Sequence, residues 1–187
     1  MTCTSPHLGL EEPGHTRARY GQWAGQARGV INELPDPVLT QVYRLKAVMG
    51  PPQDFADGPA SHRWVVPLVG GIFTGPELNG NLQPGGSVSW RITLPDGAAV
   101  ADIRYTLRTG GGALLRVRSA GAIHGSNDMV AEGLRSGADV ASGEHLFHAA
   151  THIETAARDL NWLNWGVFVT VTRPTVPTML CETYLVG

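Results

Sequence analysis

The chain has 187 residues, enough for one domain with a buried core, and 42% of them are hydrophobic. Only 16% are charged, against about 25% in an average domain, so we expect a weakly charged surface that is compatible with a homo-oligomer. The net charge of −2 argues against a nucleic-acid partner, because a phosphate backbone selects a basic surface.

The two cysteines, Cys3 and Cys181, stand at opposite ends of the chain, without the spacing of metal ligands or of a disulfide framework. Glu11, Glu12 and Pro13 interrupt the region where a signal peptide needs an apolar run. No stretch approaches the ~18 consecutive apolar residues of a membrane span. We therefore expect a soluble, cytoplasmic protein without a membrane partner.

The first half of the chain changes from an irregular to a strand-like pattern. Residues 1–37 mix Gly, Pro, His and charged residues without a period, which predicts a poorly ordered extension before a single domain over residues 38–187. Residues 38–49 alternate as a strand does, and residues 51–62 indicate a loop. In the next strand pattern, Pro67 and the pair Gly70-Gly71 indicate an edge, a bulge or a sharp bend.

Further strand patterns follow to the end of the chain. Those before the glycine-rich segment cover residues 87–94 and 98–109 around the turn sequence Pro95-Asp96-Gly97, and those after it cover residues 113–121, 145–154, 164–173 and 178–186. Between them, Ser126 or Asn127 would cap a short helix that ends at Gly137. About eight strands and one short helix predict a compact antiparallel barrel or sandwich.

The run Gly110-Gly111-Gly112 raises the question of a phosphate-binding loop. Such a loop leads from a strand into a helix and carries Lys and Ser or Thr behind its glycines, whereas a second strand pattern follows here. We therefore predict a hairpin with Gly110-Gly111 as a two-residue loop, which places Tyr105 opposite Arg116 and Ile103 opposite Arg118.

In that register both faces of the hairpin hold polar groups, which predicts a small barrel with a partly polar lumen. The alternative is that Asp102, Arg104 and Arg108, which follow one another at period two, form a solvated outer face. The sequence does not choose between these two interpretations.

His148, His152 and Glu154 would share one face of a strand, which suggests a metal-binding face, whereas His145 would point the other way. Residues two apart on one strand are separated by about 6–7 Å, too far for a single ion, so we predict a hydrogen-bonded barrel histidine and no metal. A serine-hydrolase elbow and a dinucleotide fingerprint are absent, and no cofactor is expected. Cys181 lies in an apolar strand pattern, where a thiol is normally an inert core residue.

Three segments, residues 70–86, 102–121 and 147–169, together resemble a bacterial and fungal family, domain of unknown function 3237, which includes UPF0311-like proteins. The resemblance covers about residues 40–187 and implies a lipocalin-like β-barrel. It also implies a cofactor-free cyclase, since family members in natural-product gene clusters catalyse reactions such as intramolecular hydroalkoxylation of an aromatic polyketide. The chain departs from the family pattern at Gly110 and Gly111, where acidic residues are usual, and at Ser89, where Asp is usual. If the family site uses those groups, this protein has a changed substrate or a changed chemistry.

On this basis Glu154 is the candidate general base, and Arg118 the fixed charge for an enolate or phenolate oxygen. Asp102 would be a second acid or the partner that orients Arg118, and Tyr105 would donate a hydrogen bond or form an aromatic wall. The candidate substrate-binding residues are Trp90, Asn164, His124 and His152. Each has a plainer interpretation as an ion pair, a core aromatic or a turn cap.

We therefore predict an antiparallel lipocalin-like β-barrel that cyclises or isomerises an apolar, aromatic or polyketide-type small molecule in its lumen. Exclusion of water and a fixed substrate conformer would supply part of the rate acceleration. The alternatives are a non-catalytic carrier of the same shape and a structural module at a subunit interface.

Overall fold

The structure is a computed structural model that describes residues 34–57, 61–93, 99–123, 147–175 and 177–187. The predicted helix at residues 126–137, the turn at Pro95-Asp96-Gly97, His124 and most of the predicted extension lie outside the described residues. Residues Pro37–Gly187 form one compact unit. No helix in the described part of the chain has the length and hydrophobicity needed to cross a bilayer.

The described residues form nine strands and one short 3₁₀ helix. In chain order they are β1 (Leu39–Met49), β2 (Gln53–Asp57), β3 (Ser61–Thr74), β4 (Gly80–Thr93), β5 (Ala99–Thr109), β6 (Leu114–Ile123), β7 (Phe147–Glu154), η1 (Arg158–Asn164), β8 (Phe168–Thr175) and β9 (Thr178–Val186). The alternating apolar residues of these segments explain the strands, since period two places every second side chain on one face.

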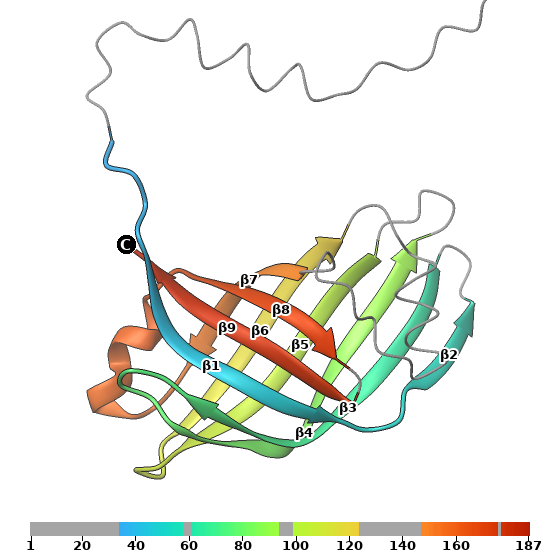
Figure 1. Cartoon of the computed structure of the whole chain (residues 1–187), viewed down its shortest axis with the longest axis horizontal. Coiled ribbons are helices and arrows are strands. Elements are labelled where there is room, and N and C mark those ends of the chain that lie inside the picture. The colour runs from blue at the N-terminus through green and yellow to red at the C-terminus, as the bar shows by residue number, and fades with distance from the viewer. Residues whose placement is uncertain (1–33, 58–60, 94–98, 124–146, 176) are drawn as a thin grey trace, which may run out of the picture. The chain divides into compact units, whose positions relative to one another are not determined.

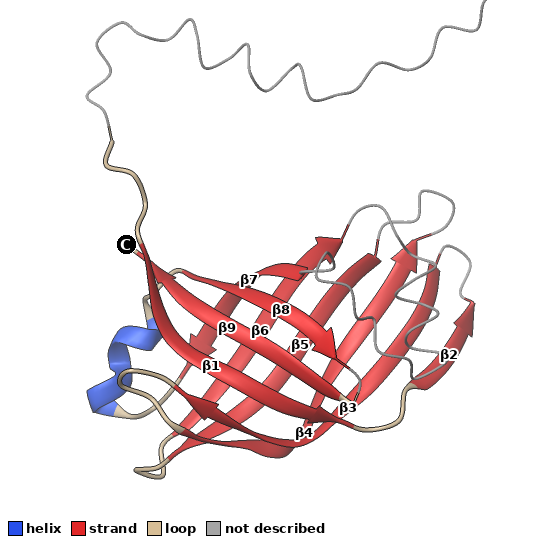
Figure 2. Cartoon of the chain, viewed as in Figure 1, coloured by secondary structure: helices blue, strands red, loops and turns tan. Residues whose placement is uncertain are grey.

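The strands close into an antiparallel barrel, as Figure 1 shows. Strands β3 to β9 pair with their chain neighbours, and β1 pairs with β9 on one side and β3 on the other, which joins the two edges of the sheet. The predicted barrel is therefore confirmed, and the alternative of a two-sheet sandwich is wrong. Strand β2, in the predicted loop, pairs with β3 beyond the point where β1 leaves it. Helix η1, blue in Figure 2, lies at one end of the barrel.

The interior of the barrel is filled by side chains. On β7 buried and exposed residues alternate along the whole strand, and β5 buries Ile103, Tyr105 and Leu107. Aromatic rings pack edge to face, as Trp90 does on Phe147 with 5.6 Å between the ring centroids. Eight strands, β1 and β3 to β9, close the barrel, and a barrel of that size is just wide enough for its own side chains.

The polar side chains in the interior are hydroxyls that bond to one another across the strands. We call this series the hydroxyl girdle: Ser119, Thr151, Thr170, Thr183, Tyr43 and Tyr105, from β6, β7, β8, β9, β1 and β5. The successive oxygen–oxygen distances are 2.8 Å, 2.6 Å and 2.9 Å along the threonines, and 3.1 Å between the two tyrosines. Because β1 and β5 are not neighbours, the tyrosine pair crosses the interior.

The β5–β6 hairpin is present, but its predicted register is wrong by one residue. The loop has three residues, Gly110-Gly111-Gly112, since the Thr109 amide donates to the Ala113 carbonyl at 2.9 Å. Gly112 has a φ of +89°, a conformation that a glycine adopts without the Cβ clash. Tyr105 therefore pairs with Val117 instead of Arg116. A one-residue shift moves every side chain of β6 to the other face, so the arginines of β6 point outward.

Two other features bear on the sequence analysis. Of the edge, bulge or sharp bend predicted around Pro67 and Gly70-Gly71, the structure has a bulge, seen as a shift in the β3–β4 register between Leu68 and Gly71. Helix η1 was not predicted. Its Asn164 side chain accepts from the Thr155 amide at 2.8 Å and donates to the Thr155 carbonyl at 3.0 Å, which fixes the end of β7.

Candidate active site

A groove of about 510 Å³ lies on the outer face of the barrel, across β4, β5, β6 and β7. Side chains that carry charge or a titratable ring dominate its walls. Its lining residues are Pro84, Gly85, Gly86, Arg104, Tyr105, Thr106, Arg116, Val117, Arg118, His152 and Glu154. A concave site with convergent polar groups is the usual place for a small-molecule ligand.

The backbone of β4 forms one wall of this groove. The register of β4 against β5 shifts between Gln83 and Ser87, so the segment Pro84-Gly85-Gly86 bulges from the ladder. A Cβ on Gly86 would lie 2.9 Å from the Arg104 carbonyl oxygen, and glycine lets the two strands approach closely there. The bulge thus lines one side of the groove, beside β5.

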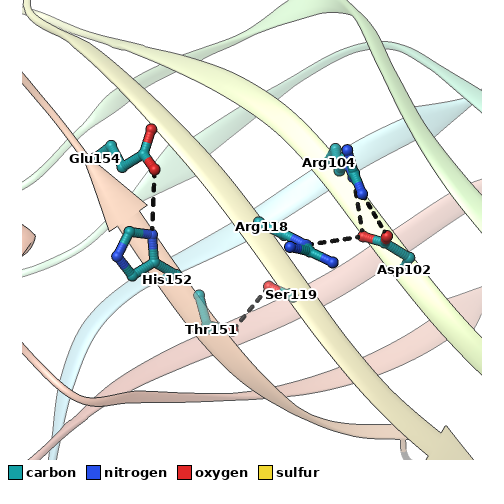
Figure 3. Close-up of polar contacts among 7 residues, drawn as sticks. All are labelled: Asp102, Arg104, Arg118, Ser119, Thr151, His152 and Glu154. Carbon is teal, nitrogen blue, oxygen red and sulfur yellow. Dashed lines mark hydrogen bonds and ion pairs between the residues drawn. The ribbon is translucent and has the colours of Figure 1, made fainter.

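The structure brings four predicted site residues, Asp102, Arg118, His152 and Glu154, to this outer face and not to the lumen (Figure 3). The prediction of a lumen lined by these charged groups is therefore wrong, and the alternative of a solvated outer face with Asp102, Arg104 and Arg108 fits. The reason is the register: the side chains that alternate with them, such as Ile103 on β5, fill the interior.

Three basic side chains stand in a row on neighbouring strands. Arg104 on β5 lies directly opposite Arg118 on β6, and Arg118 lies directly opposite His152 on β7. We call Arg104, Arg118 and His152 the basic row. Asp102 contacts both arginines, through a two-pronged bond from Arg104 at 3.2 and 2.8 Å and through Arg118 Nε at 3.5 Å. The bond from Arg104 lowers the pKa of the Asp102 carboxyl below its ordinary value.

The other end of the groove holds the carboxylate of Glu154. Arg116, its cross-strand partner, approaches Glu154 Oε2 with Nη1 at 3.5 Å, and His152 Nδ1 lies 3.6 Å from Oε1. These distances are long for hydrogen bonds, and about half of the Glu154 side chain is exposed. The carboxylate is therefore accessible from the groove, with a cation and an imidazole beside it.

The remaining predicted residues have structural contacts. Tyr105 floors the groove, but its ring points inward and its hydroxyl bonds to Tyr43, where burial raises the pKa of Tyr105 well above its ordinary value. Trp90 is buried in the core. Asn164 caps the end of β7 through Thr155, which matches its plainer interpretation.

Sequence reasoning left out Arg104, Arg116 and the β4 bulge as parts of the site. Arg104 and Arg116 carried a signal, since they stand at period two with Asp102 and Arg118, and the hairpin register would have joined them into one surface. The segment Pro84-Gly85-Gly86 carried none, because it precedes the strand predicted at residues 87–94, whereas β4 begins at Gly80.

Among the described residues, no three His, Cys, Asp or Glu side chains lie close enough together to hold a metal ion. The groove itself offers a carboxylate beside guanidinium groups. Proton transfer to the carboxylate and stabilisation of an oxyanion by a guanidinium are the two steps this arrangement can supply.

A second, more apolar cleft of about 350 Å³ lies near η1, and it holds few charged groups. Its lining residues are Thr40, Gln41, Val42, Pro76, Glu77, Trp162 and Leu185. This cleft contains none of the predicted site residues.

Comparison with known proteins places this chain in a family. The family model described as "Protein of unknown function (DUF3237)" matches residues 37–186, which is nearly the whole described barrel. The chain belongs to the DUF3237 family. As a DUF3237 protein it is 26% identical over 131 residues to a UPF0311 protein of Clostridium acetobutylicum, with 70% of this chain and 82% of that protein covered.

Solved structures share the barrel of this DUF3237 protein. A β-barrel-like protein from Acinetobacter baumannii matches with a TM-score of 0.70 and 25% identity, over 84% of this chain and all of that one. An enzyme from Penicillium herquei matches with a TM-score of 0.59 and 20% identity, over the same shares of the two chains. At that identity the second match shows the fold alone. The barrel is thus compatible with binding of a small molecule.

Proposed function

We propose that this protein is a cofactor-independent cyclase or isomerase of an aromatic or polyketide-type small molecule, acting in the groove on the outer face of the barrel. The observation that supports it is the placement of an accessible carboxylate, Glu154, beside the cation of Arg116 at 3.5 Å within a 510 Å³ groove. A base next to a fixed positive charge is the minimum that an ionic cyclisation requires. The fold of an enzyme from Penicillium herquei is consistent with this proposal.

Intramolecular ether formation illustrates the chemistry. Glu154 takes the proton from a substrate hydroxyl, and the hydroxyl oxygen attacks the β-carbon of an alkene conjugated to a carbonyl. One C–O bond forms, the alkene π bond breaks, and the negative charge moves to the carbonyl oxygen as an enolate, which Arg116 stabilises. The protonated Glu154 then returns the proton to the α-carbon of the enolate, which restores the carbonyl. The product is an isomer of the substrate, so no oxidant, reductant or cofactor is consumed.

The side chains around Glu154 contact its carboxylate and shape the space beside it. His152 lies 3.6 Å from one carboxylate oxygen and Arg116 lies 3.5 Å from the other, so each oxygen has a polar side chain beside it. The groove also confines a substrate between the β4 bulge and β7, which limits its conformers. Tyr105 contributes the floor and not a hydroxyl donor.

The test is a panel of hydroxylated aromatic polyketides and phenols, with binding followed by the shift in denaturation midpoint and products analysed by mass and chiral chromatography. We expect a product of unchanged mass from the wild-type protein. Removal of the base in Glu154→Gln should lower turnover about 10²–10⁴-fold while binding is retained. Glu182→Gln is the matched control, because Glu182 forms an outward ion pair with Arg44 at 2.7 Å and does not line the groove.

Each outcome decides between enzyme and carrier. Turnover that Glu154→Gln abolishes and Glu182→Gln leaves unchanged supports the proposal. Equal binding to both variants without conversion by the wild-type protein would replace it with the carrier function. Equal loss of turnover in the two variants would refute the role given to Glu154.

A further inference from the structure

Within the basic row, Arg104 and Arg118 place like charges directly opposite one another, which the sheet does not require. Arg104, Arg118 and His152 occupy adjacent cross-strand positions on β5, β6 and β7. Like-charged side chains in such positions repel and destabilise the pairing. A feature that breaks a local rule of stability in this way is typical of a functional site.

Asp102 relieves only part of this repulsion. It is engaged by both prongs of Arg104, and Arg118 reaches it with one nitrogen at 3.5 Å (Figure 3). In and around the groove, three guanidinium groups of the described residues thus face two carboxylates, Asp102 and Glu154. One positive charge is left without a counterpart. It belongs to the pair Arg104 and Arg118, which share Asp102, since Glu154 already has Arg116.

The arginines of the row are also positioned to bind a ligand. The side chains of Arg104 and Arg118 are 57% and 60% exposed, and both line the groove. Asp102 fixes the Arg104 fork, so little freedom is lost when a ligand binds. A planar guanidinium recognises carboxylate oxygens through two parallel N–H donors, which makes Arg the residue suited to a flat anion.

We infer that the basic row is the recognition site for a single negative charge on a planar ligand, a carboxylate attached to an aromatic ring. This inference rests on the proposed function and names the substrate class: an aromatic monoanion, held by Arg104, Arg118 and His152 while its reacting hydroxyl faces Glu154. The charge count selects a monoanion, because one positive charge is uncompensated. A phosphate monoester would bring a second negative charge next to Asp102 and Glu154.

Non-reacting probes test the inference by titration calorimetry. The probes are 2-naphthoate, the neutral naphthalene-2-carboxamide of the same shape, and 2-naphthyl phosphate. We expect naphthoate to bind about tenfold or more tightly than the carboxamide, as charge-assisted hydrogen bonds predict, and its affinity to fall with added salt. The phosphate should bind more weakly than naphthoate.

Variants locate the charge that is responsible. Arg118→Gln should weaken naphthoate about tenfold or more and leave the carboxamide within about twofold. Arg108→Gln is the control, because Arg108 lies on the same outer face of β5 but does not line the groove. The ligand-free denaturation midpoint of Arg118→Gln should be unchanged or raised, because the substitution removes the repulsion from Arg104 and keeps the bond between Arg104 and Asp102.

The results separate this inference from the proposed function. Tight binding of naphthoate that depends on Arg118, without turnover of any hydroxylated substrate, would support the anion site and refute the cyclase. Equal affinity for naphthoate and the carboxamide, a tighter naphthyl phosphate, or an equal loss in Arg108→Gln would overturn the anion site. Turnover that survives Arg118→Gln at low substrate concentration would keep the cyclase and also overturn the anion site.

Discussion

The hydrogen bond between Tyr43 and Tyr105 crosses the barrel interior, and its removal should show a clear asymmetry between the two tyrosines. Both side chains are buried, with 0% and 4% exposed. Tyr43→Phe leaves the Tyr105 hydroxyl with no partner among the described residues, which should cost about 1–3 kcal/mol of unfolding free energy. Tyr105→Phe leaves the Tyr43 hydroxyl bonded to Thr183, so its cost should be nearer 1 kcal/mol.

The assay is urea denaturation of both single variants and the double variant. In Tyr43→Phe/Tyr105→Phe the unpartnered hydroxyl is gone, so the double variant should lose less than the sum of the singles, with a coupling of about 0.5–3 kcal/mol. For a chain of this length each kcal/mol corresponds to about 2–4 °C in Tm. Equal costs of the two single variants, or strict additivity, would refute the bond across the interior.

Alkaline pH gives a second readout of the same pair. Burial raises the pKa of Tyr43 to about 12, whereas the unfolded tyrosine loses its proton near pH 10. The native state therefore holds a proton that the unfolded state has lost. Its contribution to the unfolding free energy is fully present below pH 10 and declines by about 1.4 kcal/mol per pH unit between pH 10 and pH 12. Burial raises the pKa of Cys181 to about 12 as well, so Tyr43→Phe should reduce the alkaline slope without abolishing it.

Three further predictions concern the girdle, the end of β7 and the groove. Thr170→Val keeps the volume but removes the middle link of the hydroxyl girdle, so unfolding free energy should fall by about 1–3 kcal/mol, and an unchanged urea midpoint would contradict the girdle. Asn164→Ala loses both bonds to Thr155 and should lower Tm by several degrees, about 1–2 kcal/mol, in a thermal scan; a change under a degree would show that η1 holds its place without them. Asp102→Asn loses the pairing with Arg104 and should cost less than about 1 kcal/mol at neutral pH, because the pair is partly exposed. Since the folded pKa of Asp102 is depressed, that stabilisation is present above the ordinary carboxyl pKa and is lost as pH falls through the folded value; a pH-independent difference between the two proteins would refute it.

Period-two alternation located most of the strands, but it did not tell which face points inward. On the β5–β6 hairpin both faces carry polar residues, so the direction of Arg116 and Arg118 depended on the loop between the strands. A two-residue loop turns these arginines toward the core, and the three-residue loop that Gly112 permits turns them to the surface. The pairing of β1 with both β3 and β9 could not be predicted either, because strand patterns alone do not say which strands are neighbours.

The interior could not be read from composition, because threonine suits either face of a strand. Thr151, Thr170 and Thr183 lie in strand patterns where a hydroxyl is as typical of an outer face as of the core. Their burial follows from register, which brings each hydroxyl within reach of the next across neighbouring strands. Helix η1 was missed for another reason: a 3₁₀ helix of seven residues is too short for an amphipathic period to appear.

The girdle and the basic row together explain why the candidate site lies outside the barrel. The girdle satisfies the hydroxyls inside, and the tyrosine pair joins β1 to β5 through the centre, so a ligand in the interior would have to break bonds whose loss is costly. On the outer face the balance is reversed. Arg104 and Arg118 repel each other when no ligand is bound, and an anion between them would lower the energy of the sheet as well as bind. Binding of an anion should therefore stabilise the barrel, through the same two arginines.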